Sequence, residues 1–266
     1  MTQSESEAEA AESTESLAWR LEADFSLLEA RERLIRLREE IAGRIVFTTS
    51  FGLEDQILTH LIASEALDVE IVTLDTGRLF PQTYALWAES EARFGRRIRA
   101  VYPDRVALEN LVADQGIDGF YAAVAMRKAC CAIRKVEPLG RALDGASAWI
   151  TGLRADQSAE RKRMPLVEFD ADRRLIKANP LLDWTREEAI AFAKERSVPI
   201  NPLHAAGFLS IGCAPCTRAV QHGESERNGR WWWESEDEKE CGLHVGPDGR
   251  LVRGPQIQSD GAERMT

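Results

Sequence analysis

Residues 44–55 decide the fold of this chain: Arg44-Ile-Val-Phe-Thr-Thr-Ser50 followed by Phe-Gly-Leu-Glu-Asp55. The first seven form a short β-rich run that ends in polar residues, and the chain from Gln56 to Leu67 has the spacing of a helix. The pattern predicts a strand, a polar turn and then a helix. A glycine at such a turn lets backbone N–H groups approach an anion at the helix N-terminus.

The same unit recurs further along the chain. Further strands are predicted at 69–74, 97–102, 148–151 and 175–178, and helices at 81–94 and 185–196. Thr185 and Glu188 form a capping-box start for the last helix. Apolar residues from Leu17 to Ile41 predict one long amphipathic helix before the first strand. Strands that alternate with helices indicate an α/β fold with a Rossmann-like parallel sheet and crossover helices.

Three polar stretches follow predicted strands: Ser50–Asp55, Leu74–Arg78 and Thr151–Arg154. In open α/β sheets, ligands bind beyond the carboxyl ends of the strands. Each stretch alone is also typical of an ordinary turn between a strand and a helix. Three of them at one sheet edge favour a nucleotide pocket.

Composition excludes several classes of protein. The 266 residues carry a formal charge of −10, which argues against a general nucleic-acid binder because such proteins need a broad basic surface. Residues 1–16 are rich in Ser, Glu, Ala and Thr and are expected to form a disordered acidic tail rather than a signal peptide. No stretch approaches the roughly 20 apolar residues of a membrane span. We expect a cytoplasmic protein without membrane contact, and a homo-oligomer remains open.

Four of the five cysteines occur as two pairs, Cys130-Cys131 and Cys213-Ala-Pro-Cys216. A chain without an export signal is not expected to form a disulfide framework, so metal binding or catalysis is the better interpretation. Adjacent thiolates suit an iron–sulfur cluster, whose iron atoms lie at separate corners, better than one tetrahedral zinc ion. Structural zinc and a redox disulfide between Cys213 and Cys216 are the alternatives.

The fifth cysteine, Cys241, lies in the polar stretch Glu240-Cys-Gly-Leu-His244. Such surroundings are typical of an accessible, reactive thiol rather than a buried structural one. A thiolate that attacks an anionic centre needs cations nearby, and Arg227, Arg230 and His244 flank it in sequence. Lys135 follows the adjacent cysteine pair. Residues 231–233, three consecutive tryptophans, are interpreted as packing for the C-terminal part of the chain.

Together these motifs resemble the bacterial assimilatory adenylyl-sulfate reductases, from about residue 40 to 245. The residues that carry the resemblance are Cys130-Cys131 with Lys135, Leu74-Asp-Thr-Gly-Arg-Leu-Phe-Pro81, Gly212-Cys-Ala-Pro-Cys216, Arg227 to Trp233, and Glu240-Cys-Gly-Leu-His244. The resemblance implies a fold of the adenine-nucleotide alpha-hydrolase type and a 4Fe–4S cluster on the four paired cysteines. It also implies that Cys241 is the nucleophile and that thioredoxin or glutaredoxin is the partner.

The resemblance further implies a substrate site. Lys135, Arg227, Arg230 and His244 resemble the residues that contact the phosphosulfate. Ser50, Leu74 and Gly152 resemble contacts on the adenosine side. The remaining candidates from the strand-end stretches are Gly52, Asp75, Gly77, Arg78 and Arg154.

The expected reaction is reduction of adenylyl sulfate to sulfite and AMP through an S-sulfonated Cys241, as in sulfate assimilation and cysteine biosynthesis. Related enzymes that cleave ATP carry Ser-Gly-Gly-x-Asp-Ser where this chain has Ser50-Phe-Gly-Leu-Glu-Asp55, which disfavours ATP cleavage. The alternatives are the same chemistry on 3′-phosphoadenylyl sulfate, an ATP-dependent thiolation or adenylation enzyme, and a non-catalytic zinc module. We expect a nucleotide-binding domain at 17–206 and an extension at 207–266 that completes the cluster site and carries Cys241.

Overall fold

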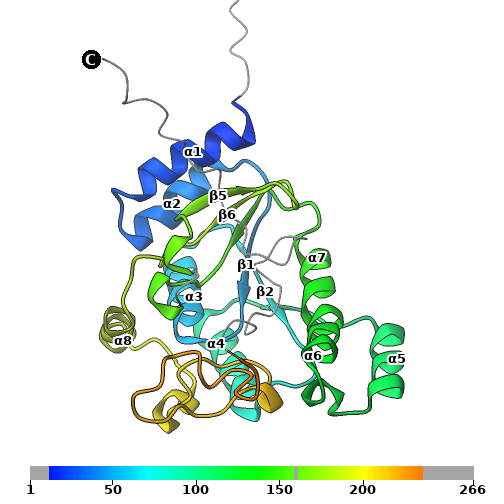
Figure 1. Cartoon of the computed structure of the whole chain (residues 1–266). Helices are drawn as coiled ribbons and strands as arrows, with labels where there is room; N and C mark the ends of the chain where they lie inside the picture. Colours follow the sequence, from blue (N-terminus) through cyan, green and yellow to red (C-terminus); the bar gives the residue numbers. More distant parts are fainter. Residues whose placement is uncertain (1–11, 159–160, 236–266) are drawn as a thin grey trace, which may run out of the picture.

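The computed structural model describes residues 12–158 and 161–235, and within them a sheet of six strands lies between two layers of helices (Figure 1). The strands are β1 Ile45–Thr49, β2 Glu70–Leu74, β3 Arg99–Val101, β4 Ala148–Ile150, β5 Val167–Asp170 and β6 Leu175–Ala178. The α-helices are α1 Thr14–Phe25, α2 Ala30–Glu40, α3 Leu53–Ser64, α4 Pro81–Phe94, α5 Arg105–Gln115, α6 Val124–Cys131, α7 Glu137–Leu143 and α8 Arg186–Glu195. Shorter helical segments are η1 Gly119–Tyr121, the π-helix η2 Ala132–Val136, η3 Ala155–Gln157, η4 Arg161–Arg163, η5 Pro202–Ala206 and η6 Ala214–Cys216.

The strand order β3-β2-β1-β4-β6-β5 confirms the predicted α/β fold. Each neighbouring pair from β3 to β6 is parallel, and β5 runs antiparallel to β6 at the edge. The chain proceeds outward from β1 to β2 and β3, and then returns to place β4 on the other side of β1. The switch point therefore lies between β1 and β4, which is where open sheets of this kind bind ligands.

Alternation along each strand divides the core between the two faces of the sheet. Phe47 and Ile71 belong to the larger core, which also holds buried residues of α1, α2, α3 and α8. Val46 and Val72 point to the opposite face, where they pack with Leu139 of α7. Successive side chains of a strand alternate between faces, so both faces of these apolar strands are covered.

Two features differ from the sequence prediction. The single helix predicted at 17–41 is wrong: α1 ends at Phe25 and α2 begins at Ala30, because a capping box of Glu29 and Glu32 starts a new helix. The helix α1 also begins at Thr14, three residues before the predicted domain boundary. The capping box at Thr185 is confirmed at the start of α8.

The edge strand β5 has no counterpart in the prediction. It carries Glu168, whose carboxylate accepts a 2.8 Å hydrogen bond from Lys177 of β6. Both side chains are buried. A strand is usually predicted from alternating apolar residues. Charged residues within these two short strands interrupt that alternation, so the pattern does not indicate β5.

In the part of the chain that the structure describes, no helix is long and apolar enough to cross a membrane.

Candidate active site

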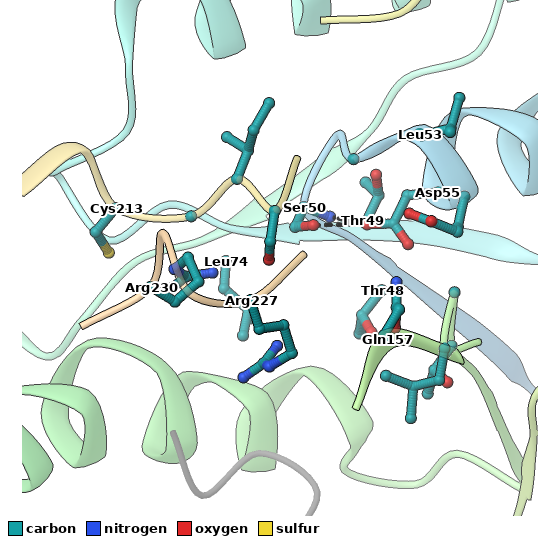
Figure 2. A pocket seen from close by; sticks show the side chains of 18 of the residues that line it. Thr48, Thr49, Ser50, Leu53, Asp55, Leu74, Gln157, Cys213, Arg227 and Arg230 are labelled. Atoms are coloured by element: carbon teal, nitrogen blue, oxygen red, sulfur yellow. Dashed lines mark hydrogen bonds between the residues drawn. The ribbon is translucent and has the colours of Figure 1, made fainter. Parts of the chain in front are cut away.

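A cavity of about 200 Å³ lies at the carboxyl edge of the sheet (Figure 2). Residues at the ends of three strands line it: 48–50 at the end of β1, 73–74 in β2, and 151–152 after β4. It therefore occupies the switch point between β1 and β4. The predicted pocket at this edge is present, with Ser50, Gly52, Leu74 and Gly152 in its wall.

The loop after β1 is held by its own polar groups. The Asp55 carboxylate accepts a 2.8 Å hydrogen bond from the Ser50 hydroxyl and another from the Ser50 backbone N–H. Phe51 adopts a left-handed backbone with φ of 61°, and its N–H donates to the Thr49 hydroxyl. Burial raises the pKa of Asp55 to about 6, although the hydrogen bonds from Ser50 oppose that shift.

Gly152 brings the loop after β4 against the loop after β1. A Cβ atom at this position would collide with the Asp55 carboxylate and press on the Cβ of Glu54. Only glycine fits so close an approach. We call the wall formed by Thr49, Ser50, Asp55 and Gly152 the loop end of the cavity.

Arg154 has a different place from the one predicted. It lies outside the cavity lining, is fully buried, and donates to Glu54 at 2.6 Å and to Glu226 at 2.8 Å, with Asp156 as a third partner. Three carboxylates each accept a hydrogen bond from its guanidinium group and offset its charge, and the predicted substrate contact stays a prediction. Arg154 ties the strand-end loops to the segment that follows Gly207.

The loop after β2 contributes Thr76 to the main cavity and Arg78 to the neighbouring group of cysteines. The Asp75 carboxylate accepts hydrogen bonds from the Gly77 N–H (2.9 Å) and the Tyr84 hydroxyl (2.8 Å), and Gly77 has φ of 68°. Arg78 pairs with Asp118 and lies 5.3 Å from the centre of the Phe120 ring. Asp75, Gly77 and Arg78 thus lie outside the lining of the main cavity. Asp75 and Gly77 shape the loop, Arg78 faces the cysteines, and the predicted substrate contacts of the three stay predictions.

Opposite the loop end, three cations line the cavity beside Cys213. Figure 2 shows Arg230 next to Cys213 and Arg227 toward Leu74, with Asp55 on the far side of Ser50. Arg230 is buried against Gly212, whose missing side chain leaves room for the guanidinium group. Lys135 comes from the π-helix η2, directly after the adjacent cysteines. We call Lys135, Arg227 and Arg230 the cation end.

The four paired cysteines line a second, smaller cavity of about 20 Å³. Cys130 and Cys131 end α6, and Cys213 and Cys216 bracket η6. Lys135 and Cys213 line both cavities, so the cysteines adjoin the cation end. Within the described residues, no three His, Cys, Asp or Glu side chains form a ready site for a single metal ion.

The electrostatic surroundings of the two loop cysteines differ. Burial opposes ionisation of Cys213, but Lys135, the Thr76 hydroxyl and Arg230 outweigh it and lower the pKa of this thiol. The Thr76 hydroxyl lies 3.2 Å from the Cys213 sulfur. At Cys216, burial and the neighbouring Cys213 raise the pKa to about 12. Positive charge is therefore concentrated at the cysteine that faces the main cavity.

Several lining residues were missed by the sequence analysis. Gln157, Arg161, His204 and Glu226 reach the cavity from four separate segments. The basic run Arg161-Lys-Arg163 was a usable signal for one of them. The predicted packing role of the tryptophans fits Trp231, which is 1% exposed, whereas Trp232 is 39% exposed. Cys241 and His244 lie outside the described residues, and their roles stay predictions.

An open, mostly parallel sheet with a ligand-sized cavity at its switch point defines a doubly wound α/β protein that binds a ligand beyond its strand ends. The comparison with known families is more specific. Residues 44–219 match the model of the phosphoadenosine phosphosulfate reductase domain, and the chain belongs to that family.

Relatives extend the match beyond the domain. The adenosine 5′-phosphosulfate reductase of Agrobacterium fabrum is 52% identical over 205 residues, which cover 77% of this chain and 79% of that protein. The enzyme of the same name from Allochromatium vinosum is 53% identical and covers 75% and 78%. Among solved structures, phosphoadenylyl-sulfate reductase from Candida auris in a phosphate complex superposes with a TM-score of 0.65 at 27% identity, covering 76% of this chain and 96% of that one.

Proposed function

We propose that this chain reduces adenylyl sulfate to sulfite and AMP in sulfate assimilation, with thioredoxin or glutaredoxin as the electron donor. The observation that carries the proposal is the cation end: Lys135, Arg227 and Arg230 line the cavity next to Cys213. A phosphosulfate is anionic, and cations in a partly buried cleft offset that charge for an incoming thiolate. The names of the curated relatives support the same substrate.

The chemistry begins at Cys241. Its thiolate attacks the sulfur of adenylyl sulfate, the bond from that sulfur to the phosphate oxygen breaks, and AMP leaves with the bonding electron pair. The product is an S-sulfonated Cys241. A thioredoxin thiolate then attacks the Cys241 sulfur and expels sulfite, and the second thioredoxin thiol releases Cys241 as a thiolate. The dithiol supplies both electrons, and thioredoxin leaves as its disulfide.

The described residues divide the binding task. The loop end offers backbone and hydroxyl groups to a neutral nucleoside, with the Ser50 loop fixed by Asp55. The cation end receives the phosphate and the sulfonate, and stabilises the negative charge that passes from sulfur to the leaving phosphate. Lys135 is common to both cavities, so it lies between the substrate and the cysteines.

We also propose that Cys130, Cys131, Cys213 and Cys216 hold a 4Fe–4S cluster. Four thiols around one cavity form an all-sulfur donor set, which suits iron–sulfur centres. Arg78, Arg127, Arg134 and Lys135 line that cavity as well, and their charges offset that of a thiolate-bound centre. When bound, the cluster supplies a fixed charge distribution that tunes the field at Lys135.

Replacement of Cys241 by Ser tests the nucleophile. We expect sulfite release from adenylyl sulfate to vanish while the visible absorption of the purified protein persists. Cys213→Ser is the matched variant, and we expect it to bleach that absorption. Sulfite release by Cys241→Ser would refute the mechanism, and zinc without acid-labile sulfide in the wild-type protein would refute the cluster.

A second substrate, 3′-phosphoadenylyl sulfate, is favoured by one observation, the structural likeness to the Candida auris enzyme. We expect adenylyl sulfate to win a direct competition between the two. Release of pyrophosphate from ATP would instead indicate an adenylation or thiolation enzyme.

A further inference from the structure

Three guanidinium groups surround the side chain of Trp231. The Cζ atoms of Arg127, Arg230 and Arg227 lie 4.7, 4.8 and 5.9 Å from centroids of its rings. Arg227 and Arg230 belong to the cation end, whereas Arg127 comes from α6, three residues before Cys130. Guanidinium groups are attracted to the face of an indole, so one ring orients cations from two separate segments.

The backbone of Trp231 is fixed in an unusual conformation. Its φ of 41° lies in the left-handed region, which a bulky residue rarely adopts. The Trp231 N–H donates to the Cys216 carbonyl at 3.2 Å, and the Trp231 carbonyl accepts from the Glu234 N–H at 2.9 Å. Strain of this kind persists only where the surroundings determine it, and it often marks functional sites.

Arg127 is held beside the ring by a carboxylate. Its Nε and Nη2 atoms donate to Glu234 at 3.0 and 2.5 Å, and the two side chains are 0% and 2% exposed. This carboxylate offsets one of the three positive charges around Trp231. Without it, the like charges of the three guanidinium groups would repel one another and displace those that line the cavity.

We infer that Trp231 and the Arg127–Glu234 pair are positioning residues that aim Arg227 and Arg230 at the anionic part of the nucleotide. This inference rests on the proposed function, since it takes the nucleotide to be the ligand. The three residues act through the cation end and leave binding of the nucleoside unaffected.

The test compares binding of AMP and adenosine by the intact protein, measured by calorimetry. We expect Glu234→Gln to weaken AMP binding about tenfold and to leave adenosine binding within about twofold. Trp231→Phe keeps an aromatic face and should retain most AMP affinity, whereas Trp231→Leu should lose about tenfold. Glu65→Gln, which removes the half-buried partner of the exposed Arg31, is the matched control and should change neither affinity.

The outcomes separate the two proposals. If the wild-type protein binds neither AMP nor adenosine, the proposed function fails. If it binds both, and Glu234→Gln weakens both equally or neither, the pair has a merely structural role and the inference is overturned. Loss of visible absorption together with AMP affinity would place Arg127 with the cysteines instead, and would likewise overturn it.

Discussion

The loop end of the cavity is built by the sheet, whereas the cation end is built mainly by an irregular segment. Ser50 and Gly152 lie within two residues of the ends of β1 and β4, so the hydrogen bonds of the strands place their backbone groups. The guanidinium groups of Arg227 and Arg230 lie at the ends of long side chains. Buried contacts from Trp231 and Arg154 hold the segment that carries them. Strand ends are sufficient to present backbone groups to a neutral nucleoside. Binding of an anionic group requires charged side chains, which other side chains must orient.

Removal of one arginine from the cation end should have the largest effect on activity. We expect Arg230→Ala to lower kcat/KM for adenylyl sulfate by about 10³-fold, because a buried cation that stabilises developing charge is commonly worth several kcal/mol. Steady-state sulfite production measures the effect, and adenosine binding should be unchanged. Arg218→Ala removes a partly exposed arginine of the same segment, paired with Glu224, and should stay within about twofold. Equal losses in the two variants would contradict the comparison.

The loop end should differ from the cation end in the pH dependence of stability that the Asp55 carboxyl group causes. Its folded pKa of about 6 lies above its ordinary value of 3.8, so the folded state binds the extra proton. The contribution of Asp55 to stability should therefore fall as pH rises from about 4 to 6, by up to about 3 kcal/mol. Asp55→Asn should abolish this fall and be more stable than wild type at pH 7.5 but not at pH 4, as measured by urea unfolding. The exposed Asp172→Asn should follow the wild-type profile, and an unchanged profile in Asp55→Asn would refute the assignment.

Substitution of one glycine at each end of the cavity compares the loop end with the cation end without removing any charge. Gly212→Ala would displace the Arg230 guanidinium, and Gly152→Ala would displace the carboxylate of Asp55. We expect the first to weaken AMP binding about tenfold and spare adenosine, and the second to weaken both by a similar factor. Gly140→Ala, on α7 with open space around it, is the control. Identical patterns from Gly212 and Gly152 would show that the two ends are not separate.

Sequence was a good guide where local patterns and tertiary structure agree. The stretch 45–49 and the helix at 81–94 follow directly from their residues, and the cavity lies at the strand ends that the order of elements predicts. The break between α1 and α2 was missed because both helices bury apolar residues in the same core, and their stripes join into one apparent pattern. The strand β5 was missed because Glu168 finds its partner only across the sheet.

The residues of the site were harder to predict from the sequence than the strands and helices. Ser50 and Gly152 were found because the cavity edge is set by topology, and Lys135 and Arg227 because they match a family pattern. Arg154 has a conspicuous position at a strand end, yet its environment depends on Glu226, 72 residues further along the chain. No local pattern could show that its charge is already offset.

The π-helix η2 sets the angular phase between the cysteine pair and the rest of the fold. It joins α6, which ends at Cys131, to α7, whose Leu139 is fixed in the core. Each residue advances an α-helix by about 100°, and a wide π turn is how a helix accommodates an extra residue. Deletion of one residue within 132–136 would therefore turn this stretch into ordinary α-helix and leave α6 and α7 close to their present phase. The side chains of the stretch itself would be rotated, so Lys135 would no longer line both cavities.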